Sequence, residues 1–279
     1  LESASQASVT EGTDTWGAIY TTKSSTDYEI INNRAFQTMV KAETTGSNLF
    51  EESYTTTSTT TYDNNGYKPD GTLEDPAKIL GALLGVTGAS LTKGTDTWGA
   101  GYTTTSTTEY TIINNRAFQS NVIAETIGDN LFGESYTTFS ATYYRYDASL
   151  KEIILDGITK KVYGGLIDAS SSSVTRGSDI WGAGYLTINI TGYIIEHNRA
   201  LQSKVYSFTT GSNLFGESYK TRSDTAYTYK ITPKGFNGKD LYGVLESASQ
   251  ASVTNGTDTW GASYTTTSTT DYEIINNRA

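Results

Sequence analysis

The most constraining feature of this sequence is an aromatic pattern that recurs seven times. Each copy begins with a glycine, followed four positions later by Trp or Phe, four positions later by Tyr and eight positions later by a second Tyr. Recurrence of this kind is typical of repeat proteins built from one structural unit. The aromatic residues of the seven copies, the expected structural motif of the fold, are Trp16, Tyr20, Tyr28; Phe50, Tyr54, Tyr62; Trp98, Tyr102, Tyr110; Phe132, Tyr136, Tyr144; Trp181, Tyr185, Tyr193; Phe215, Tyr219, Tyr227; and Trp260, Tyr264, Tyr272.

Two longer periods are superimposed on this pattern. The tryptophans recur about every 80 residues, and residues 1–35 match residues 245–279 at 31 of 35 positions. We therefore expect a tandem array whose larger period is 244 residues, the distance from position 1 to position 245. The predicted units are repeat unit 1 at 1–82, repeat unit 2 at 83–165, repeat unit 3 at 166–244 and a partial fourth unit, one hairpin, at 245–279.

The spacing of the aromatic residues favours strands over helices. Side chains an even number of positions apart lie on one face of a strand, and the aromatic spacings of four and eight are both even. The residues between the tyrosines are mostly β-branched Thr, a poor helix former. The sequence predicts one strand over 15–31, with Trp16, Tyr20 and Tyr28 on one face and Lys23 on the opposite, solvated face.

The connection after this predicted strand can be made in two ways. A three-residue loop at 32–34, or a bulge, pairs Ile30 with Phe36 and keeps both on the apolar face. A two-residue Asn-Asn turn instead pairs Tyr28 with Gln37 and moves Phe36 to the solvated face. We expect the loop or the bulge, with Asn in the left-handed conformation.

The other connections are predicted to differ in length. A four-residue loop at 11–14 would pair Val9 with Trp16 and place both on the apolar face. Three longer loops differ in sequence between copies and are the variable points of the array, at 63–76, 145–158 and 228–239.

The expected fold class is therefore all-β, with tandem repeats of long antiparallel hairpins and about four strands per unit of about 82 residues. An open repeat array, or a fibre subunit, fits best because each hairpin can bury its aromatic face against the next one. A closed β-barrel, a sandwich or a propeller is the alternative, although 82 residues is long for one propeller blade.

Composition excludes several classes of function. The net charge is −10 with only 20 basic residues, so a basic face for nucleic acid is not expected. There is no Cys and only one His, which removes thiol chemistry and makes a metal or His-based active site improbable. No apolar run is long enough for a membrane helix, and no pair of carboxylates recurs as glycoside hydrolysis would require. We expect a protein that is not an enzyme and that has no cofactor.

The repeated acidic turns are the only candidate ligand contacts. An Asp two positions before a Trp could bind a sugar hydroxyl or contribute weakly to a calcium site. One carboxylate per turn is few for either role, and an Asp that accepts backbone hydrogen bonds within its own turn explains the pattern better. These candidate residues are Asp14, Asp96, Asp179 and Asp258.

The sequence thus predicts an extracellular or cell-surface structural protein that forms a β-rich fibre, sheath or matrix. Its composition is similar to that of repetitive adhesins and fibre proteins. The expected partners are copies of itself, joined by strand addition in which residues 260–275 meet strands of another chain; nucleic-acid binding and membrane insertion are not expected. The alternative is a multivalent lectin or adhesin that binds polysaccharide through the repeated Gly-Thr-Asp-x-Trp turns or the variable loops.

Overall fold

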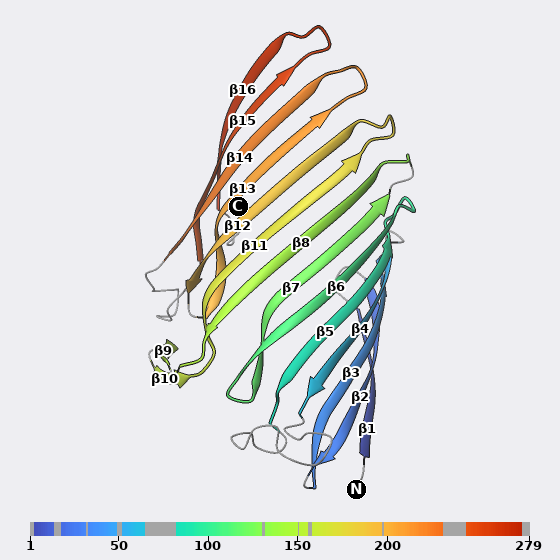
Figure 1. Cartoon of the computed structure of the whole chain (residues 1–279), viewed down its shortest axis with the longest axis vertical. Helices are drawn as coiled ribbons and strands as arrows, with labels where there is room; N and C mark the ends of the chain where they lie inside the picture. The colour runs from blue at the N-terminus through green and yellow to red at the C-terminus, as the bar shows by residue number, and fades with distance from the viewer. Residues whose placement is uncertain are drawn as a thin grey trace. The chain divides into compact units, whose positions relative to one another are not determined.

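A computed structural model describes residues 3–13, 18–31, 33–48, 52–64, 82–129, 132–149, 151–155, 158–196, 198–230 and 244–274. These residues form strands and turns, and no helix occurs among them (Figure 1). The strands are β1 (Ser3–Thr13), β2 (Ile19–Ile31), β3 (Arg34–Ser47), β4 (Ser53–Asp63), β5 (Gly85–Thr95), β6 (Gly101–Ile113), β7 (Arg116–Asp129), β8 (Ser135–Asp147), β9 (Lys151–Leu155), β10 (Ile158–Val162), β11 (Gly165–Ser178), β12 (Gly184–Glu196), β13 (Arg199–Ser212), β14 (Ser218–Lys230), β15 (Val244–Thr257) and β16 (Ser263–Tyr272).

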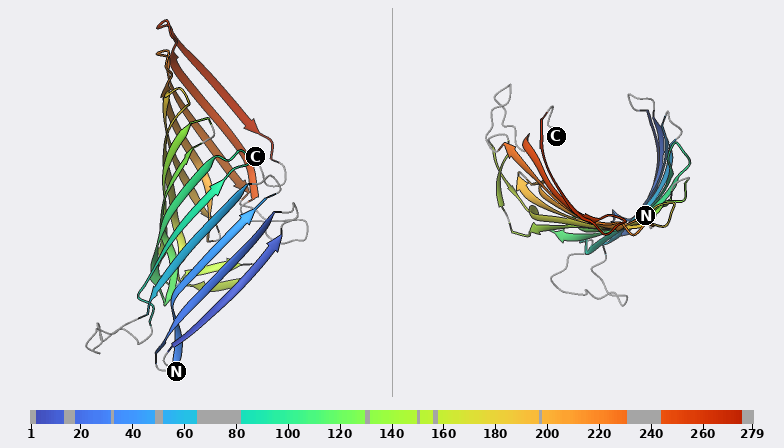
Figure 2. Two further views of the ribbon diagram at one scale, coloured as in Figure 1. Left: turned by 90° about the vertical axis from the view of Figure 1, so that its right-hand side faces the viewer. Right: turned by 90° about the horizontal axis from the view of Figure 1, so that it is seen from above.

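The chain divides into two compact units, Leu1–Gly133 and Glu134–Ala279. In the first unit β1 to β7 follow one another as antiparallel neighbours in chain order. In the second unit the order is β8 followed by β11 to β16, and β9 and β10 form a separate hairpin (Figures 1 and 2). Among the described residues β1 pairs only with β2, and β16 pairs only with β15. The expected all-β array of tandem antiparallel hairpins is confirmed, and it is open rather than closed.

The predicted strand at 15–31 was too long at its start. The strand begins at Ile19, and its counterparts begin at Gly101, Gly184 and Ser263, each three residues after the Trp. Trp98, Trp181 and Trp260 therefore belong to the turns. The predicted pairing of Val9 with Trp16 is also wrong, because Val9 lies opposite Lys23.

The connection between β2 and β3 is the two-residue turn, and the predicted loop at 32–34 is wrong. Ile31 lies opposite Arg34, Ile30 opposite Ala35, and Tyr28 opposite Gln37. The register then shifts at Thr38, where a bulge is held by a hydrogen bond from the Thr38 hydroxyl to the Asp27 carbonyl (3.1 Å).

This bulge resolves the conflict over which residues face solvent. Phe36 lies opposite Glu29 on the predicted solvated face, where it is half-buried, and the extra residue returns Val40 to the other face beside Thr26. The turns require left-handed backbone, and Asn provides it: φ is +50° at Asn114 and +61° at Asn115, the pair of positive values of a type I′ turn.

Two of the three predicted variable loops lie largely outside the described residues, at 63–76 and 228–239. The third, at 145–158, contains β9 and the start of β10.

Burial alternates along the strands without forming a deep core. In β2 the even-numbered residues from Thr22 to Ile30 are half-buried, and most odd-numbered ones are exposed. The buried apolar residues are Val86, Ile113, Ala169 and Ala248, and no large side chain in the described part of the chain is fully buried. The strands are thus held together mainly by their backbone hydrogen bonds and by rows of side chains that cross them.

Candidate binding site at the hairpin tips

In the three described Gly-Thr/Ser-Asp-x-Trp sequences, the Asp organises its own turn. In the turn between β5 and β6, Oδ1 of Asp96 accepts hydrogen bonds from the backbone N–H of Trp98 and of Ala100, both 2.9 Å long. The backbone N–H of Gly99 donates to the Asp96 carbonyl, and Gly99 has a φ of +85°. The same bonds recur around Asp179 and Asp258. The carboxylate therefore fixes the backbone next to the Trp. Asp14 lies outside the described residues.

The turns that carry Phe use a related but different arrangement. Oδ1 of Asn213 accepts from the backbone N–H of Phe215 and of Glu217, each at 3.0 Å. Its amide Nδ2 then donates to Oε2 of Glu217 at 2.5 Å, and Asn48 bonds Glu52 in the same way. An Asp here would place two carboxylates together, which explains why Asn accompanies Glu.

The residue four positions after the Asp or Asn depends on which of the two is present. This correlation can be recognised in the sequence, but the alternation of side chains along the strands does not reveal it. Four turns have Asp with Ala four positions later, and three have Asn with Glu four positions later. The pairs are Asp14–Ala18, Asp96–Ala100, Asp179–Ala183, Asp258–Ala262, Asn48–Glu52, Asn130–Glu134 and Asn213–Glu217.

The first aromatic residue of the pattern is exposed at the turn. The exposed fractions are 75 % for Trp98, 68 % for Trp181, 92 % for Trp260, 76 % for Phe132 and 77 % for Phe215. The expectation that these rings share the face of the tyrosines and join neighbouring hairpins is not met by these five residues. Trp16 and Phe50 lie outside the described residues.

The first tyrosine of each copy does lie within the sheet, opposite a glycine. The row runs Gly12, Tyr20, Gly46, Tyr54, Gly94, Tyr102, Gly128 in the first unit and Tyr136, Gly177, Tyr185, Gly211, Tyr219, Gly256, Tyr264 in the second. A Cβ built on Gly177 would be 2.4 Å from the ring of Tyr185, and five other glycines meet their tyrosine as closely. The glycine therefore makes room for a ring that covers its backbone.

A row of threonines runs parallel to the tyrosine–glycine row, two residues after each tyrosine and two residues before each glycine. Every strand apart from β9 and β10 contributes one Thr, and several neighbours form hydroxyl–hydroxyl bonds. The measured pairs are Thr22–Thr44 (2.9 Å), Thr56–Thr92 (2.9 Å), Thr104–Thr126 (2.8 Å), Thr138–Thr175 (2.8 Å), Thr187–Thr209 (3.0 Å) and Thr221–Thr254 (2.8 Å). These polar bonds join β2 to β3, β4 to β5 and β6 to β7 in the first unit, and β8 to β11, β12 to β13 and β14 to β15 in the second.

In three copies the second tyrosine lies opposite a small or aliphatic residue of the next strand, whereas Tyr28, Tyr110 and Tyr193 each lie opposite a glutamine. Tyr62 lies opposite Val86, and Tyr144 lies opposite Ala169; both partners are buried. Burial, and secondarily the neighbouring Tyr110, raises the pKa of Tyr62 above its ordinary value. The other tyrosines at this place in the pattern are Tyr28, Tyr110, Tyr193, Tyr227 and Tyr272.

A groove lies beside the turns of the second unit. It has a volume of about 310 Å³. Tyr185, Tyr219 and Tyr264 line it, together with the turn residues Asp179, Asn213 and Glu217. These side chains come from β12, β14 and β16, and from the turns between β11 and β12 and between β13 and β14, so the groove crosses several hairpins at the end where the Trp and Phe are exposed.

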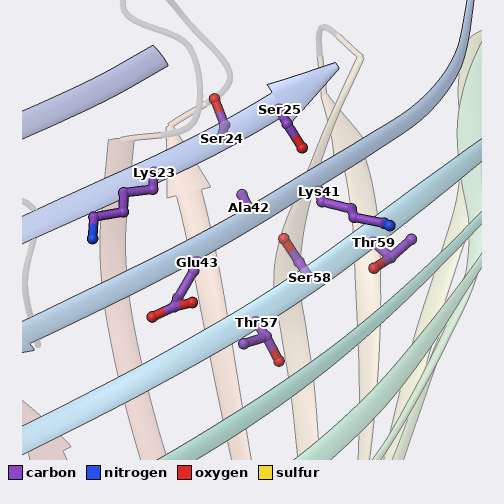
Figure 3. A pocket seen from close by; sticks show the side chains of 9 residues that line it. All are labelled: Lys23, Ser24, Ser25, Lys41, Ala42, Glu43, Thr57, Ser58 and Thr59. Atoms are coloured by element: carbon purple, nitrogen blue, oxygen red, sulfur yellow. The ribbon is translucent and has the colours of Figure 1, made fainter. Parts of the chain in front are cut away.

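Two further depressions lie away from the turns. In the first unit a hollow of about 380 Å³ is lined by residues of β2, β3 and β4, including Lys23, Lys41 and Glu43 among Ser, Thr and Ala (Figure 3). In the second unit a hollow of about 360 Å³ is lined by Tyr206 and Asp224, among others. Charges of both signs and short hydroxyl side chains make the first hollow typical of a solvated sheet surface.

The described residues contain no group of three or more His, Asp or Glu side chains placed to hold a metal ion. Nor does that part of the chain include a helix long and apolar enough to cross a membrane. Comparison of the sequence with protein-family models and with curated proteins, and of the fold with solved structures, found no match.

Proposed function

We propose that this chain is an extracellular structural protein that forms a β-rich fibre, sheath or matrix by adding the edge strand of one copy to the edge strand of the next. The observation that carries the proposal is the continuity of the rows. Tyrosine alternates with glycine from strand to strand, and Thr follows Thr, so a further hairpin of the same type extends the sheet without a change in packing.

The strand β16 supports this proposal because it closely repeats the sequence of β2, yet among the described residues it pairs on one side only, whereas β2 pairs with both β1 and β3. The two strands differ at three of ten aligned positions, 19–28 and 263–272. All ten residues of β16 are exposed, whereas β2, paired on both sides, has alternate residues half-buried. Strand addition to β16 would give it the environment that the same sequence has in β2.

The junction of β14 and β15 indicates how a second copy would add. Residues 1–13 repeat residues 245–257 of β15 with a single change, Glu11 for Asn255. In β14 and β15 the opposed pairs are Tyr219–Gly256, Thr221–Thr254, Ser223–Ser252, Thr225–Gln250 and Tyr227–Ala248. When β16 meets β1 of a second copy in this register, the opposed pairs are Tyr264–Gly12, Thr266–Thr10, Ser268–Ser8, Thr270–Gln6 and Tyr272–Ala4. Each pair has the residue types of its counterpart in β14 and β15.

Such a contact joins two different surfaces, so it leaves new edges at both ends. Head-to-tail interfaces of this type grow into open filaments rather than closed dimers unless the rotation between copies closes a ring. The backbone groups along the outer edges of β1 and β16 would then pair between chains as they do inside each unit.

Engineered cysteines can test the register, because the chain has no Cys of its own. Thr221 and Thr254 lie opposite each other with hydroxyls 2.8 Å apart, a separation that suits a disulfide between cysteines at such positions. The double variant Thr10→Cys/Thr266→Cys is expected to form a ladder of covalent multimers on non-reducing gels. Each single variant is expected to give dimers at most.

The matched control moves one cysteine out of register. In the proposed junction Ala4 lies six residues from Thr10 along β1, about 20 Å away. The variant Ala4→Cys/Thr266→Cys is expected to give no ladder under the same oxidation. A ladder of equal strength from this control, or none from the register-matched pair, would contradict the proposal.

A further inference from the structure

The groove beside the turns of the second unit has features that strand addition does not use. Its aromatic lining is rigid, because Tyr185, Tyr219 and Tyr264 each lie over a glycine of the preceding strand. A Cβ on Gly177 or Gly256 would be 2.4 Å from its tyrosine ring. The three rings are also partly open to solvent, with 37 %, 36 % and 46 % of their surfaces exposed. They are therefore held in place before any ligand arrives.

The polar lining of the groove consists of the carboxylates of Asp179 and Glu217, the amide of Asn213 and the hydroxyls of Ser212 and Ser218, besides the tyrosines. Oδ1 of Asp179 is occupied by two backbone N–H groups of its turn, and no described residue bonds its other oxygen. Oε2 of Glu217 is held by Asn213. Among the described residues, no Lys or Arg lines the groove. Such a lining suits a ligand that donates hydrogen bonds and disfavours an anionic one.

The exposed rings lie at the turns on the same end of the sheet as the groove, and Trp181 and Phe215 follow the groove residues Asp179 and Asn213 by two positions. Trp181, Phe215 and Trp260 belong to three successive turns, between β11 and β12, β13 and β14, and β15 and β16. Successive turns are two strands apart, or about 9.5 Å at the usual spacing of strands. This distance is close to the length of a disaccharide in an extended β-linked glycan, so rings at this period can meet every second sugar.

We propose that this groove and its three exposed rings bind an extended, neutral, cellulose-type β-glucan. The apolar faces of the sugar rings pack against Trp181, Phe215 and Trp260, whose large apolar surfaces have little cover in the free protein. The sugar hydroxyls donate to the acceptors of Asp179 and Glu217. The site goes beyond the proposed structural role, and it would attach the fibre to a polysaccharide.

The structure of the turns indicates that the exposed rings have a role, because each turn fixes the backbone that carries its ring. Each exposed ring follows an Asp or Asn whose Oδ1 bonds the backbone N–H of the ring-bearing residue. This bond fixes the backbone from which the ring projects, although folding of the hairpin needs no ring of this size at an exposed position. The alternation of Trp and Phe keeps an aromatic side chain in all seven turns of the sequence.

Affinity electrophoresis of the full chain tests the site, with hydroxyethyl-cellulose as the neutral glucan and polygalacturonate as the anionic glycan. The native chain is expected to be retarded by the neutral glucan and not by polygalacturonate. The variant Trp181→Ala/Phe215→Ala/Trp260→Ala is expected to have an apparent Kd weaker by at least about tenfold, since it lacks the three stacking surfaces. These side chains are exposed, so their removal leaves the fold intact, which circular dichroism verifies.

The matched control removes two exposed aromatic rings from the same unit but away from the turns. Tyr206 and Phe208 lie on β13 with 41 % and 40 % exposed. The variant Tyr206→Ala/Phe208→Ala is expected to be retarded as strongly as the native chain. No retardation of the native chain, equal retardation of the triple variant, or loss of retardation in the control would overturn the proposal.

The same triple variant separates this proposal from the structural role. Combined with Thr10→Cys/Thr266→Cys, it is expected to form the ladder of covalent multimers while it no longer binds the glucan. Loss of the ladder in the triple variant would place the three rings in the contact between chains and would overturn their assignment to the glucan.

Discussion

Gly177 of β11 lies directly opposite Tyr185 of β12, and the tyrosine ring covers the glycine so closely that a Cβ there would be 2.4 Å from it. This contact explains why a glycine precedes every first tyrosine by eight positions. The turn between them brings the two residues opposite each other, and only glycine leaves room for the ring. The pattern thus encodes one contact between neighbouring strands, repeated along each unit.

Substitution of Gly177 by Ala is therefore expected to destabilise the protein by about 1–3 kcal/mol, the usual cost of overpacking. Gly184 is the matched control, because the nearest atom to a Cβ there is the Gly177 carbonyl oxygen at 3.9 Å. Urea unfolding measures both variants. Removal of the Tyr185 ring should relieve this overpacking. Gly177→Ala is therefore expected to lower the free energy of unfolding less in the Tyr185→Ala variant than in the native chain. Equal effects of Gly177→Ala and Gly184→Ala would argue against a steric role for the ring.

The Asn–Glu turns predict a charge effect that depends on pH. The variant Asn213→Asp replaces a donor to Glu217 with a second carboxylate, and we expect it to lower the free energy of unfolding by about 1–2 kcal/mol near neutral pH. Repulsion raises the pKa of the paired carboxyls in the folded state. Folding therefore becomes more favourable as the pH falls through that raised pKa, and the deficit shrinks on acidification.

Thermal unfolding between about pH 7 and pH 4 measures this deficit against the native chain, within the range where Asp and Glu titrate. The double variant Asn213→Asp/Glu217→Ala recreates the Asp–Ala combination of the other turns and is expected to unfold as the native chain does at neutral pH. A deficit that is independent of pH, or that persists in the double variant, would show that the Asn–Glu bond is not its cause.

The regular parts of this fold could be read from the sequence, because they depend on side-chain parity alone. The long antiparallel hairpins and the common face of Tyr20 and Tyr28 follow from even spacing along a strand. Parity could not show where each strand begins. Trp98 has the right spacing to continue the face of Tyr102, but Gly99 has a positive φ and ends the alternation.

The predicted registers failed for a related reason, since each assumed that all aromatic residues avoid water. Phe36 lies on the predicted solvated face because the turn before it has two residues, and the bulge at Thr38 then changes parity within β3 and returns Val40 to the other face. A bulge leaves no mark in a pattern of apolar residues. The candidate site was only partly foreseen. Its Asp and Tyr residues belong to the predicted motif, whereas Asn213 and Glu217 could have been found only from their correlated occurrence in the turns.

Tyr62, which is half-buried, predicts a loss of stability in alkali. Burial, and next the neighbouring Tyr110, raises the pKa of Tyr62 above 10.0, so the folded state keeps its proton at a pH where the unfolded state has lost it. Stability is complete below the pKa of the unfolded phenol and falls as the pH rises through the folded pKa. Urea unfolding between about pH 9 and pH 11 is expected to show this fall, with a smaller slope for Tyr62→Phe, which has no group that titrates in that range. An unchanged slope would show that Tyr62 does not contribute.

If copies assemble by strand addition, filament formation should depend on whether one or two strands are removed from the C-terminal end of the chain. A chain that ends at residue 258 lacks β16, so its outer strand is β15, which has nearly the same sequence as β1 and carries its glycine, as β1 does, near its C-terminal end. Antiparallel addition of a second copy then cannot continue the tyrosine and threonine rows, and we expect no filaments in negative stain.

A chain that ends at residue 230 lacks β15 as well, and its outer strand, β14, has Tyr219 and Thr221 in the places of Tyr264 and Thr266. Because β1 repeats β15, the natural neighbour of β14, this shorter chain is expected to form filaments again. Filaments from the chain that ends at 258, or none from the one that ends at 230, would contradict assembly through β1 and the outer edge.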